Sequence, residues 1–313
     1  MSDDITLRPM RADDIAAADS VFRRAFGTWF GLADPMQFRG DAGLFGSRLW
    51  SYPEGGTVAL RDGEMVGLSF ASRWGSIAVI GPIAVLPELW RHGLARTLVA
   101  AALDTASRWQ TPLAGLFTFP QSALHLRLYQ SFDFWPRHLT PIMGKPVMAD
   151  AHSAETIALS SARERDALAE ECRALAATLH PGLDLAREIA VVLERGLGDV
   201  LALVEGSRVA GFAICHNGAG SDAGSTAALV KFAMARRGPG ADERLSRILA
   251  GCESFAASRG ATRLVASAAT ARIGAYRLLC AAGFRTDVPF VSMHRPYGPA
   301  YDGPEDWVLD DWR

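Results

Sequence analysis

Hydrophobic residues in the first half of the chain recur with a period of two in some stretches and with a helical period in others. The dipeptide Asp62-Gly63 separates two apolar runs and favours a tight hairpin turn. The run 77–85 is apolar at nearly every position, which is typical of a strand buried on both faces. We predict strands at residues 5–8, 57–60, 65–72, 77–85, 113–119 and 139–143, and helices at 12–26, at 93–109 and beginning at Ser122.

The second half repeats this order of elements, although few residues match. The Gly- and Ser-rich segment 217–225 is predicted to be an exposed, mobile loop. The polar segment 144–153 reads as a linker, so we expect two domains, at residues 1–147 and 154–313. The strands expected in the second half are 156–159, 200–204, 209–216, 227–235 and 263–269, and the helices are 162–179, 183–195, 241–259 and 271–282.

Composition narrows the class of protein. The chain has 313 residues, of which 49% are hydrophobic and 21% charged, as expected of a packed globular protein. Its formal net charge of −2 gives no indication of a nucleic-acid partner. No apolar run is long enough for a membrane span, and the acidic N-terminus lacks the pattern of a signal peptide, so a cytoplasmic protein is expected. The 4 cysteines and 7 histidines show no metal-ligand spacing, and the pattern does not distinguish a monomer from a homodimer.

The most informative stretch runs from Ile83 to Thr97. An apolar strand ends there, a short turn follows, and a helical pattern begins directly after Gly93. The first N–H groups of a helix have no partners within it, and they lie at the positive end of its dipole. Such a strand, loop and helix can bind a pyrophosphate, and the small residues Gly93 and Ala95 would let the backbone approach it. Arg91 and Arg96 add positive charge.

A second stretch, from Ser122 to Arg137, contains Leu128-Tyr129 followed by Asp133-Phe134. Together the two stretches resemble the motifs of the GNAT acetyltransferases. The first motif of that family is Arg or Gln, two variable residues, Gly, one variable residue, and Gly or Ala. Here Gly93 and Ala95 fill the small positions, and Trp90 replaces the Arg or Gln.

The second motif of the family is a Leu-Tyr pair followed by Gly-Phe. Leu128 and Tyr129 match the pair, and Asp133 replaces the glycine. Aspartate tolerates a left-handed backbone, so this replacement is mild. The resemblance covers about residues 4–147, and a weaker copy follows. It implies an α/β (α+β) fold of two tandem domains, each with a mixed, mostly antiparallel sheet flanked by helices and a splayed central strand pair.

The resemblance also implies an activity, which is transfer of an acetyl group from acetyl-CoA to an amine of a small molecule or protein. Tyr129 would protonate or stabilise the leaving thiolate, because a phenol is a weaker acid than a thiol. A tyrosine that only packs on the sheet is the alternative. The residues expected to bind the cofactor are Ile83, Ala84 and Val85 through their backbone, and Arg91, His92, Gly93, Leu94, Ala95, Arg96, Ser122 and His125.

No general base is evident. The predicted strand 77–85 contains no Asp, Glu or His, and Glu88 in the following turn reads as a solvated residue. A water chain or a residue from the second half could take this role. A non-catalytic acyl-CoA sensor therefore remains an alternative to an enzyme, and so does transfer of an acyl group larger than acetyl. His125 has a packing or surface role as its alternative to cofactor contact.

The second copy looks degenerate. Arg237 and Gly240 match the first motif, but Asp242 occupies its last small position, where a carboxylate would repel a pyrophosphate. The tyrosine position holds Leu279. We therefore expect this half not to bind acyl-CoA.

Two further segments carry alternatives. The aromatic segment 27–55 forms either short helices beside the acceptor site, as the resemblance implies, or a packed aromatic lid. The acidic and aromatic tail 301–313 either packs its tryptophans and leaves its charges in water, or reaches the first domain and lines a site for a cationic amine.

Overall fold

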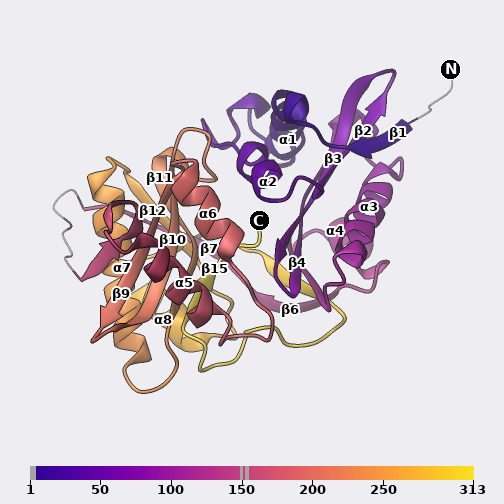
Figure 1. Cartoon of the computed structure of the whole chain (residues 1–313). Coiled ribbons are helices and arrows are strands. Elements are labelled where there is room, and N and C mark those ends of the chain that lie inside the picture. The colour runs from indigo at the N-terminus through magenta and orange to yellow at the C-terminus, as the bar shows by residue number, and fades with distance from the viewer. Residues whose placement is uncertain (1–4, 149–150, 152–154) are drawn as a thin grey trace.

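The computed structural model describes residues 5–148, 151 and 155–313. Its described residues form two β-sheets flanked by helices, one in each half of the molecule (Figure 1). The predicted α/β fold, with two mixed and mostly antiparallel sheets, is confirmed. His152 and part of the predicted linker lie outside the described residues.

The first sheet consists, in spatial order, of β1 (Ile5–Pro9), β2 (Gly56–Arg61), β3 (Glu64–Trp74), β4 (Ile77–Val85), β5 (Leu113–Thr118), β14 (Val291–Arg295) and β6 (Trp135–Leu139). The second consists of β13 (Arg285–Val288), β7 (Ile142–Pro146), β12 (Arg263–Ser267), β11 (Gly224–Ala235), β10 (Arg208–Gly218), β9 (Gly198–Glu205) and β8 (Thr156–Ala158), with β15 (Val308–Asp310) paired to β11. The α-helices are α1 (Ile15–Trp29), α2 (Phe45–Ser51), α3 (Leu94–Arg108), α4 (Ala123–Gln130), α5 (Arg165–Ala176), α6 (Ala186–Glu194), α7 (Ala241–Ser258) and α8 (Ile273–Ala281). Short 3₁₀ turns are η1 (Ala12–Asp14), η2 (Pro35–Gln37), η3 (Pro87–Leu89) and η4 (Leu159–Ser161).

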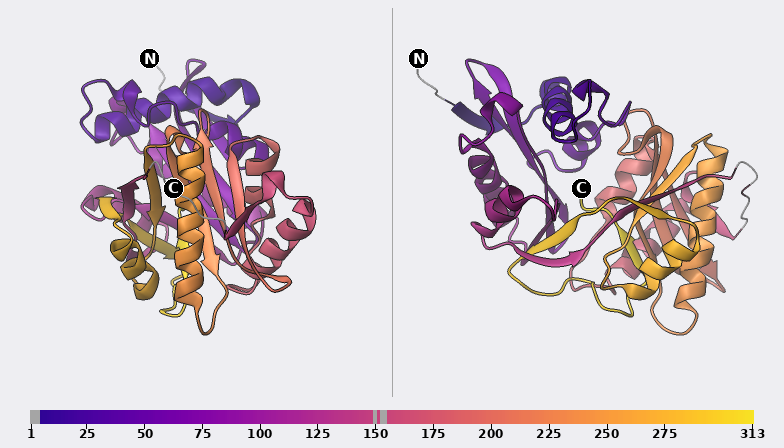
Figure 2. Two further views of the ribbon diagram at one scale, coloured as in Figure 1. Left: turned by 90° about the vertical axis from the view of Figure 1, so that its left-hand side faces the viewer. Right: turned by 180° about the vertical axis from the view of Figure 1, so that it is seen from behind.

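The two halves exchange strands. β7 follows the first half in the chain but pairs with β12 and β13 of the second sheet. β14 returns from the second half and lies between β5 and β6 of the first sheet (Figure 2). The prediction that a strand at 139–143 closes the first unit is therefore wrong, and residues 144–146 are not linker but part of β7. An alternating pattern identifies a strand but not the sheet that it joins, because the partner strands are far away in the chain.

The central strands of the first half diverge, as expected. β4 pairs with β5 only over Ile77–Val79, and beyond these residues it pairs with β3 alone, at Ile80 and 83–85. In the second half, β11 pairs with β12 only over Ala227–Leu229. There, however, the tail strand β15 pairs with β11 at Phe232–Met234. The opening that stays free in the first half is filled by the tail in the second.

One hydrophobic core joins the halves. Trp74 and Ile77 of the first sheet belong to the same buried cluster as Phe232 of the second. The rings of Trp74 and Phe232 meet edge to face, with centroids 6.0 Å apart. Trp312 of the tail is buried in this cluster as well, and Figure 1 shows the C-terminal end of the described chain between the two halves.

The segment 217–225 is not the exposed loop that its Gly- and Ser-rich sequence predicts. Ser221 and Asp222 are buried, and the loop packs against the segment after α1. The N–H of Gly43 donates to the carbonyl of Ser221 (3.0 Å), and the N–H of Gly220 donates to the carbonyl of Asp41 (3.0 Å). A polar loop can be buried when a distant segment supplies its hydrogen-bond partners, which the sequence around it does not reveal.

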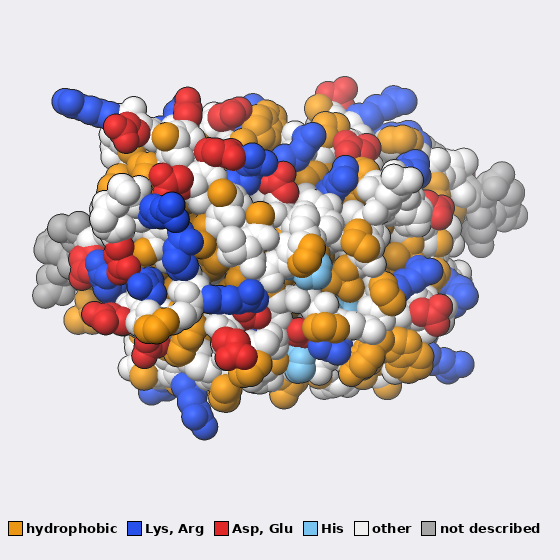
Figure 3. Space-filling view, turned by 60° about the horizontal axis from the view of Figure 1, so that its bottom comes forward, with side chains coloured by type: hydrophobic (Ala, Val, Ile, Leu, Met, Phe, Trp, Pro, Cys, Tyr) orange, Lys and Arg blue, Asp and Glu red, His pale blue; other side chains and the backbone are white. Residues whose placement is uncertain are grey.

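Within the described part of the chain, none of the helices combines the length and apolar character needed to cross a bilayer. On the face shown in Figure 3, basic and acidic side chains are interspersed with hydrophobic ones.

Candidate functional site

The turn between β4 and α3 has the backbone that its sequence predicts. Gly93 precedes α3 with φ of 87°, in the left-handed region that favours glycine. Arg91 also has a left-handed φ, of 69°. The first N–H groups of α3 have no acceptor inside the helix, so this turn can hold an anion.

This turn borders a cavity of about 480 Å³ in the opening beside β4. Its walls come from α1, the end of β4, the start of α3, the end of β5 and α4, and they are mostly apolar. The lining includes most residues predicted to bind the cofactor: Ile83, Ala84, Val85, Arg91, Gly93, Leu94, Ala95, Arg96 and His125. His92 is an exposed residue outside this lining, and Ser122 is buried at the start of α4.

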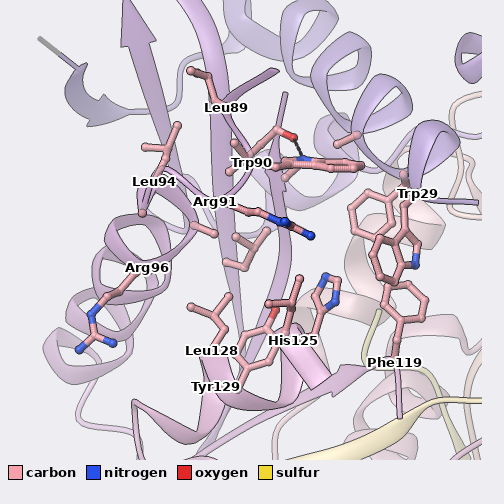
Figure 4. Close-up of a pocket in the computed structure, with 18 residues that line it drawn as sticks. Trp29, Leu89, Trp90, Arg91, Leu94, Arg96, Phe119, His125, Leu128 and Tyr129 are labelled. Atoms are coloured by element: carbon pink, nitrogen blue, oxygen red, sulfur yellow. Dashed lines mark hydrogen bonds between the residues drawn. The ribbon is translucent and has the colours of Figure 1, made fainter. Parts of the chain in front are cut away.

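The two arginines of the turn differ in direction. Figure 4 shows Arg91 pointing into the cavity between Trp90 and His125, whereas Arg96 points away. The guanidinium of Arg96 donates to the Ser131 hydroxyl (2.7 Å) and lies over the ring of Phe132. Arg91 is therefore the arginine of this turn placed to contact a ligand in the cavity.

Trp90 is a lining residue that the motif comparison did not assign. Its indole N–H donates to the carbonyl of Val85 (2.8 Å), and its ring lies across the cavity (Figure 4). The bond ties the turn to the end of β4. Trp90 stands at the motif position that usually holds Arg or Gln. This difference from the family motif is the sequence signal that could have identified Trp90 as a site residue.

Tyr129 lies on α4 and faces the same cavity. Its side chain is buried, and this burial raises the pKa of the phenol well above its ordinary value. None of the hydrogen bonds found among the described residues involves its hydroxyl. The nearby Asp133 has a left-handed φ of 62°, as its place in the glycine position of the second motif predicts.

His125 lies one helical turn before Tyr129. Its Nδ1 is 2.6 Å from the hydroxyl of Ser122, which also caps α4 by accepting from the His125 N–H. The ring packs edge-on against Trp29 and Phe119, with centroids 4.8 and 5.4 Å away. Burial lowers the pKa of this imidazole, so it is neutral at neutral pH.

A second cavity, of about 280 Å³, adjoins the first. It lies between the two halves. Its lining includes Ile142 of β7 and two residues of the tail. Sequence reasoning missed it because its walls come from segments up to almost three hundred residues apart. Five residues line both cavities: Phe26, Ile83, Phe119, His125 and Tyr129.

The aromatic segment after α1 contributes to this second cavity. It contains the short elements η2 and α2, and Phe38 stacks between Phe26 and Phe30, with centroid distances of 5.9 and 5.5 Å. The three rings line the cavity. Short helices and packed aromatic rings, the two alternatives for this segment, therefore occur together.

The tail also reaches the second cavity, where it contributes Trp312 and Arg313. Its aspartates are ion-paired instead of facing water. The pairs are Asp302 with Arg137, Asp306 with Arg237, Asp310 with Arg272, and Asp311 with Arg313. The tail therefore brings an indole and a guanidinium to the cavity, and not the free carboxylates that a site for a cationic amine would need.

The corresponding turn of the second half keeps the backbone but not the opening. Gly240 precedes α7 with a left-handed φ of 74°. Arg237 is paired with Asp306, and β15 fills the place beside β11. These contacts support the prediction that the second half does not bind acyl-CoA.

Glu88 lies at the surface, as predicted from its place in the turn. Glu88 forms an ion pair with Arg24 (3.1 Å) in which both side chains are about half exposed. No group of three or more His, Cys, Asp or Glu side chains in the described ranges is arranged to hold a metal ion.

One family model matches part of the chain. Residues 25–134 match the family described as the acetyltransferase (GNAT) family. A search of curated proteins finds no match.

Solved structures extend the similarity to the whole chain. A candidate acetyltransferase from Pyrococcus horikoshii has a TM-score of 0.74 and 15% identity, over 98% of this chain and 95% of that one. A GCN5-related N-acetyltransferase from Sphaerobacter thermophilus has a TM-score of 0.62 and 17% identity, over 95% and 96%. A tandem GNAT protein from the clavulanic acid biosynthesis pathway has a TM-score of 0.60 and 15% identity, over 95% and 100%. At these identities the likeness concerns the fold, which is that of tandem GNAT proteins.

Proposed function

We propose that this protein is an acetyl-CoA-dependent N-acetyltransferase that binds the cofactor in the first cavity and an amine in the second. The observation that carries the proposal is the junction of the two cavities. A group can pass between ligands in two cavities only where the cavities meet, and titratable side chains at this junction are His125 and Tyr129. The fold supports acyl transfer from CoA in general, and the junction supports these two residues as its chemical groups.

Acetyl-CoA would supply a thioester whose acetyl carbon is open to attack by a neutral amine. The new C–N bond forms as the C–S bond breaks, and one proton leaves the amine nitrogen. Nε2 of His125 can accept this proton when Nδ1 donates to the Ser122 hydroxyl. The proton then passes through solvent to the sulfur, so the products are an amide and a free thiol.

Tyr129 would act as a hydrogen-bond donor. Because burial raises its pKa, the phenol stays protonated throughout the neutral range. It can then donate to the sulfur as negative charge develops there. Binding would use the N–H groups at the start of α3 and the guanidinium of Arg91 for the phosphates.

Calorimetric titration with acetyl-CoA tests the location of the cofactor. The variant Gly93→Asp places a carboxylate in the turn, and Gly93→Asn is its neutral control, since both residues tolerate a left-handed backbone. We expect one site per chain, and affinity at least about tenfold lower in Gly93→Asp than in Gly93→Asn because of charge repulsion. Equal affinities in the two variants would place the cofactor elsewhere, and two sites per chain would show that the second half also binds.

A non-catalytic acyl-CoA sensor is the second candidate, and one observation favours it. β4 contains no Asp, Glu or His, so it carries no carboxylate or imidazole base. Release of free thiol from acetyl-CoA in the presence of a panel of amines separates the two functions. Tight acetyl-CoA binding without amine-dependent thiol release would support the sensor. Repeating the assay with longer acyl-CoAs would define the acyl group.

A further inference from the structure

The polar part of the second cavity contains an unpaired cation. Its lining has the charged residues Arg39, Asp222, Asp287 and Arg313. Three of them have ion-pair partners: Asp222 with Lys231 and Arg48, Asp287 with Arg263, and Arg313 with Asp311. Arg39 forms no ion pair with any described residue, and its guanidinium donates to the backbone carbonyl of Asp222.

Arg39 has an unfavourable backbone conformation and lies close to another cation. Its φ of 65° lies in the left-handed region, which is unfavourable for a side chain of this size. Removal from water and the nearby Arg313 lower the pKa of its guanidinium to about 10, although the carboxylates of Asp222 and Asp311 act in the opposite direction. Arg39 is half-buried. A half-buried cation beside another cation is stabilised by a bound anion, and a carboxylate can accept two parallel hydrogen bonds from a guanidinium.

The remaining walls of the cavity are apolar and largely aromatic. Phe38 comes from the segment after α1, Phe119 and Phe290 pack against each other with centroids 5.0 Å apart, and Trp312 comes from the tail. Such walls bind an apolar or aromatic group through burial of its surface. They would bind a hydrophilic polyamine or sugar weakly, because its polar groups would lose their hydrogen bonds to water without gaining partners in the cavity.

We propose that the acceptor is an apolar primary amine that also carries a carboxylate, which Arg39 binds. This inference rests on the proposed function, since it places the amine at the junction formed by His125 and Tyr129. An amine without a carboxylate fits this cavity less well. The carboxylates that line the cavity are already ion-paired, and its unpaired charge is positive.

Pairs of amines that differ only by the carboxylate test the proposal. Suitable pairs are L-phenylalanine with 2-phenylethylamine, and 4-(aminomethyl)benzoate with benzylamine; spermidine represents polycations. With acetyl-CoA and a thiol-release assay, we expect kcat/KM to be at least about tenfold higher for the carboxylated member of a pair, the value of one charged hydrogen bond. Equal rates within both pairs, or a preference for the decarboxylated members or spermidine, would overturn the proposal.

The variant Arg39→Gln tests the residue. It should remove the preference, with a loss of about tenfold or more for carboxylated amines and less than about twofold for the amines without a carboxylate. Turnover of the amines without a carboxylate shows that the variant is folded. Arg39→Lys keeps the charge and should retain part of the preference, and Arg127→Gln removes an exposed cation of α4 and should change nothing. A preference that survives in Arg39→Gln would remove Arg39 from the site.

Binding separates this inference from the proposed function. Calorimetry of the whole chain with the same amines, alone and with CoA, needs no turnover. Tighter binding of the carboxylated amines, lost in Arg39→Gln, would support the acceptor class even if no acetyl transfer were found. Absence of that binding, alongside acetyl transfer to other amines, would overturn the acceptor class and leave the proposed function standing.

Discussion

At the scale of single residues, burial gives Tyr129 and His125 opposite pKa shifts. Burial raises the pKa of the phenol and lowers that of the imidazole, because it disfavours the charged form of each. At neutral pH, both side chains are therefore neutral. One is an O–H donor and the other carries a free nitrogen lone pair, which are the two partners that amide formation from a thioester needs.

Replacing Tyr129 by Phe removes the donor and leaves the ring. We expect kcat to fall by about 10²–10³-fold, the usual contribution of a positioned hydrogen-bond donor, with the Kd for acetyl-CoA changed by less than about twofold. Thiol-release kinetics and calorimetry give the two quantities. Tyr276→Phe, on α8 of the second half, is the matched control and should behave as wild type. An unchanged kcat in Tyr129→Phe would remove the phenol from the mechanism.

The pH dependence of kcat tests His125 as the base. A base must be unprotonated, so kcat falls as pH drops through the pKa of His125. Because burial lowers that pKa, the acidic limb should lie below pH 6.5, the ordinary value for histidine. His125→Gln should lower kcat by about 10²-fold and abolish this limb, whereas His92→Gln, at an exposed position, should leave the profile unchanged. A limb that persists in His125→Gln would belong to another group.

At the scale of elements, the tail has two structural roles. Its strand β15 occupies the opening beside β11, so the second half lacks the free edge that forms a cavity beside β4. Its Trp312 stacks on Phe117 of β5, with centroids 5.7 Å apart, and its indole N–H donates to the hydroxyl of Tyr301 (2.9 Å). The tail therefore packs in both halves of the molecule.

Gly115 on β5 tests the packing of the tail. A Cβ at this position would lie 2.0 Å from the ring of Trp312, which is fully packed and cannot move aside easily. Gly115→Ala should lower the free energy of unfolding by about 1–3 kcal/mol, the usual cost of overpacking. Gly46 of α2 has open space around it, so Gly46→Ala should be neutral or stabilising by up to about 1 kcal/mol. Urea denaturation measures both, and equal effects would mean that Trp312 does not pack there in solution.

At the scale of the whole molecule, strand exchange makes the halves interdependent. The second sheet needs β7 between β12 and β13, and the first needs β14 between β5 and β6. A chain divided near residue 150 would leave each sheet without an inner strand and with unpaired edges.

We therefore expect the full chain to unfold in one cooperative transition. A fragment of residues 150–313 should show no cooperative transition and should aggregate, because it lacks β7 and carries β14 without its partners. Calorimetric melting and gel filtration measure these properties. Two separate transitions in the full chain, or a stable monomeric fragment, would show that the halves fold independently.

Much of the fold and part of the site were predictable because they depend on neighbours in the chain. The hairpin at Asp62-Gly63, the left-handed Gly93 before α3 and the capping of α4 by Ser122 follow from local backbone geometry and short-range hydrogen bonds. Tyr129 was predicted from its motif, and the structure places it on the cavity beside the predicted turn.

The features that decide how the halves work together depend on the tertiary structure alone. The exchange of β7 and β14, the buried loop at Ser221 and the second cavity with Arg39 bring together segments that are often more than a hundred residues apart. Such contacts depend on which surfaces can be buried together after the elements have formed, and the local pattern carries no information about them. The sequence by itself determined the elements, the turn before α3 and the class of fold. Tertiary packing decided which strands belong to which sheet, closed the opening in the second half and built the second cavity.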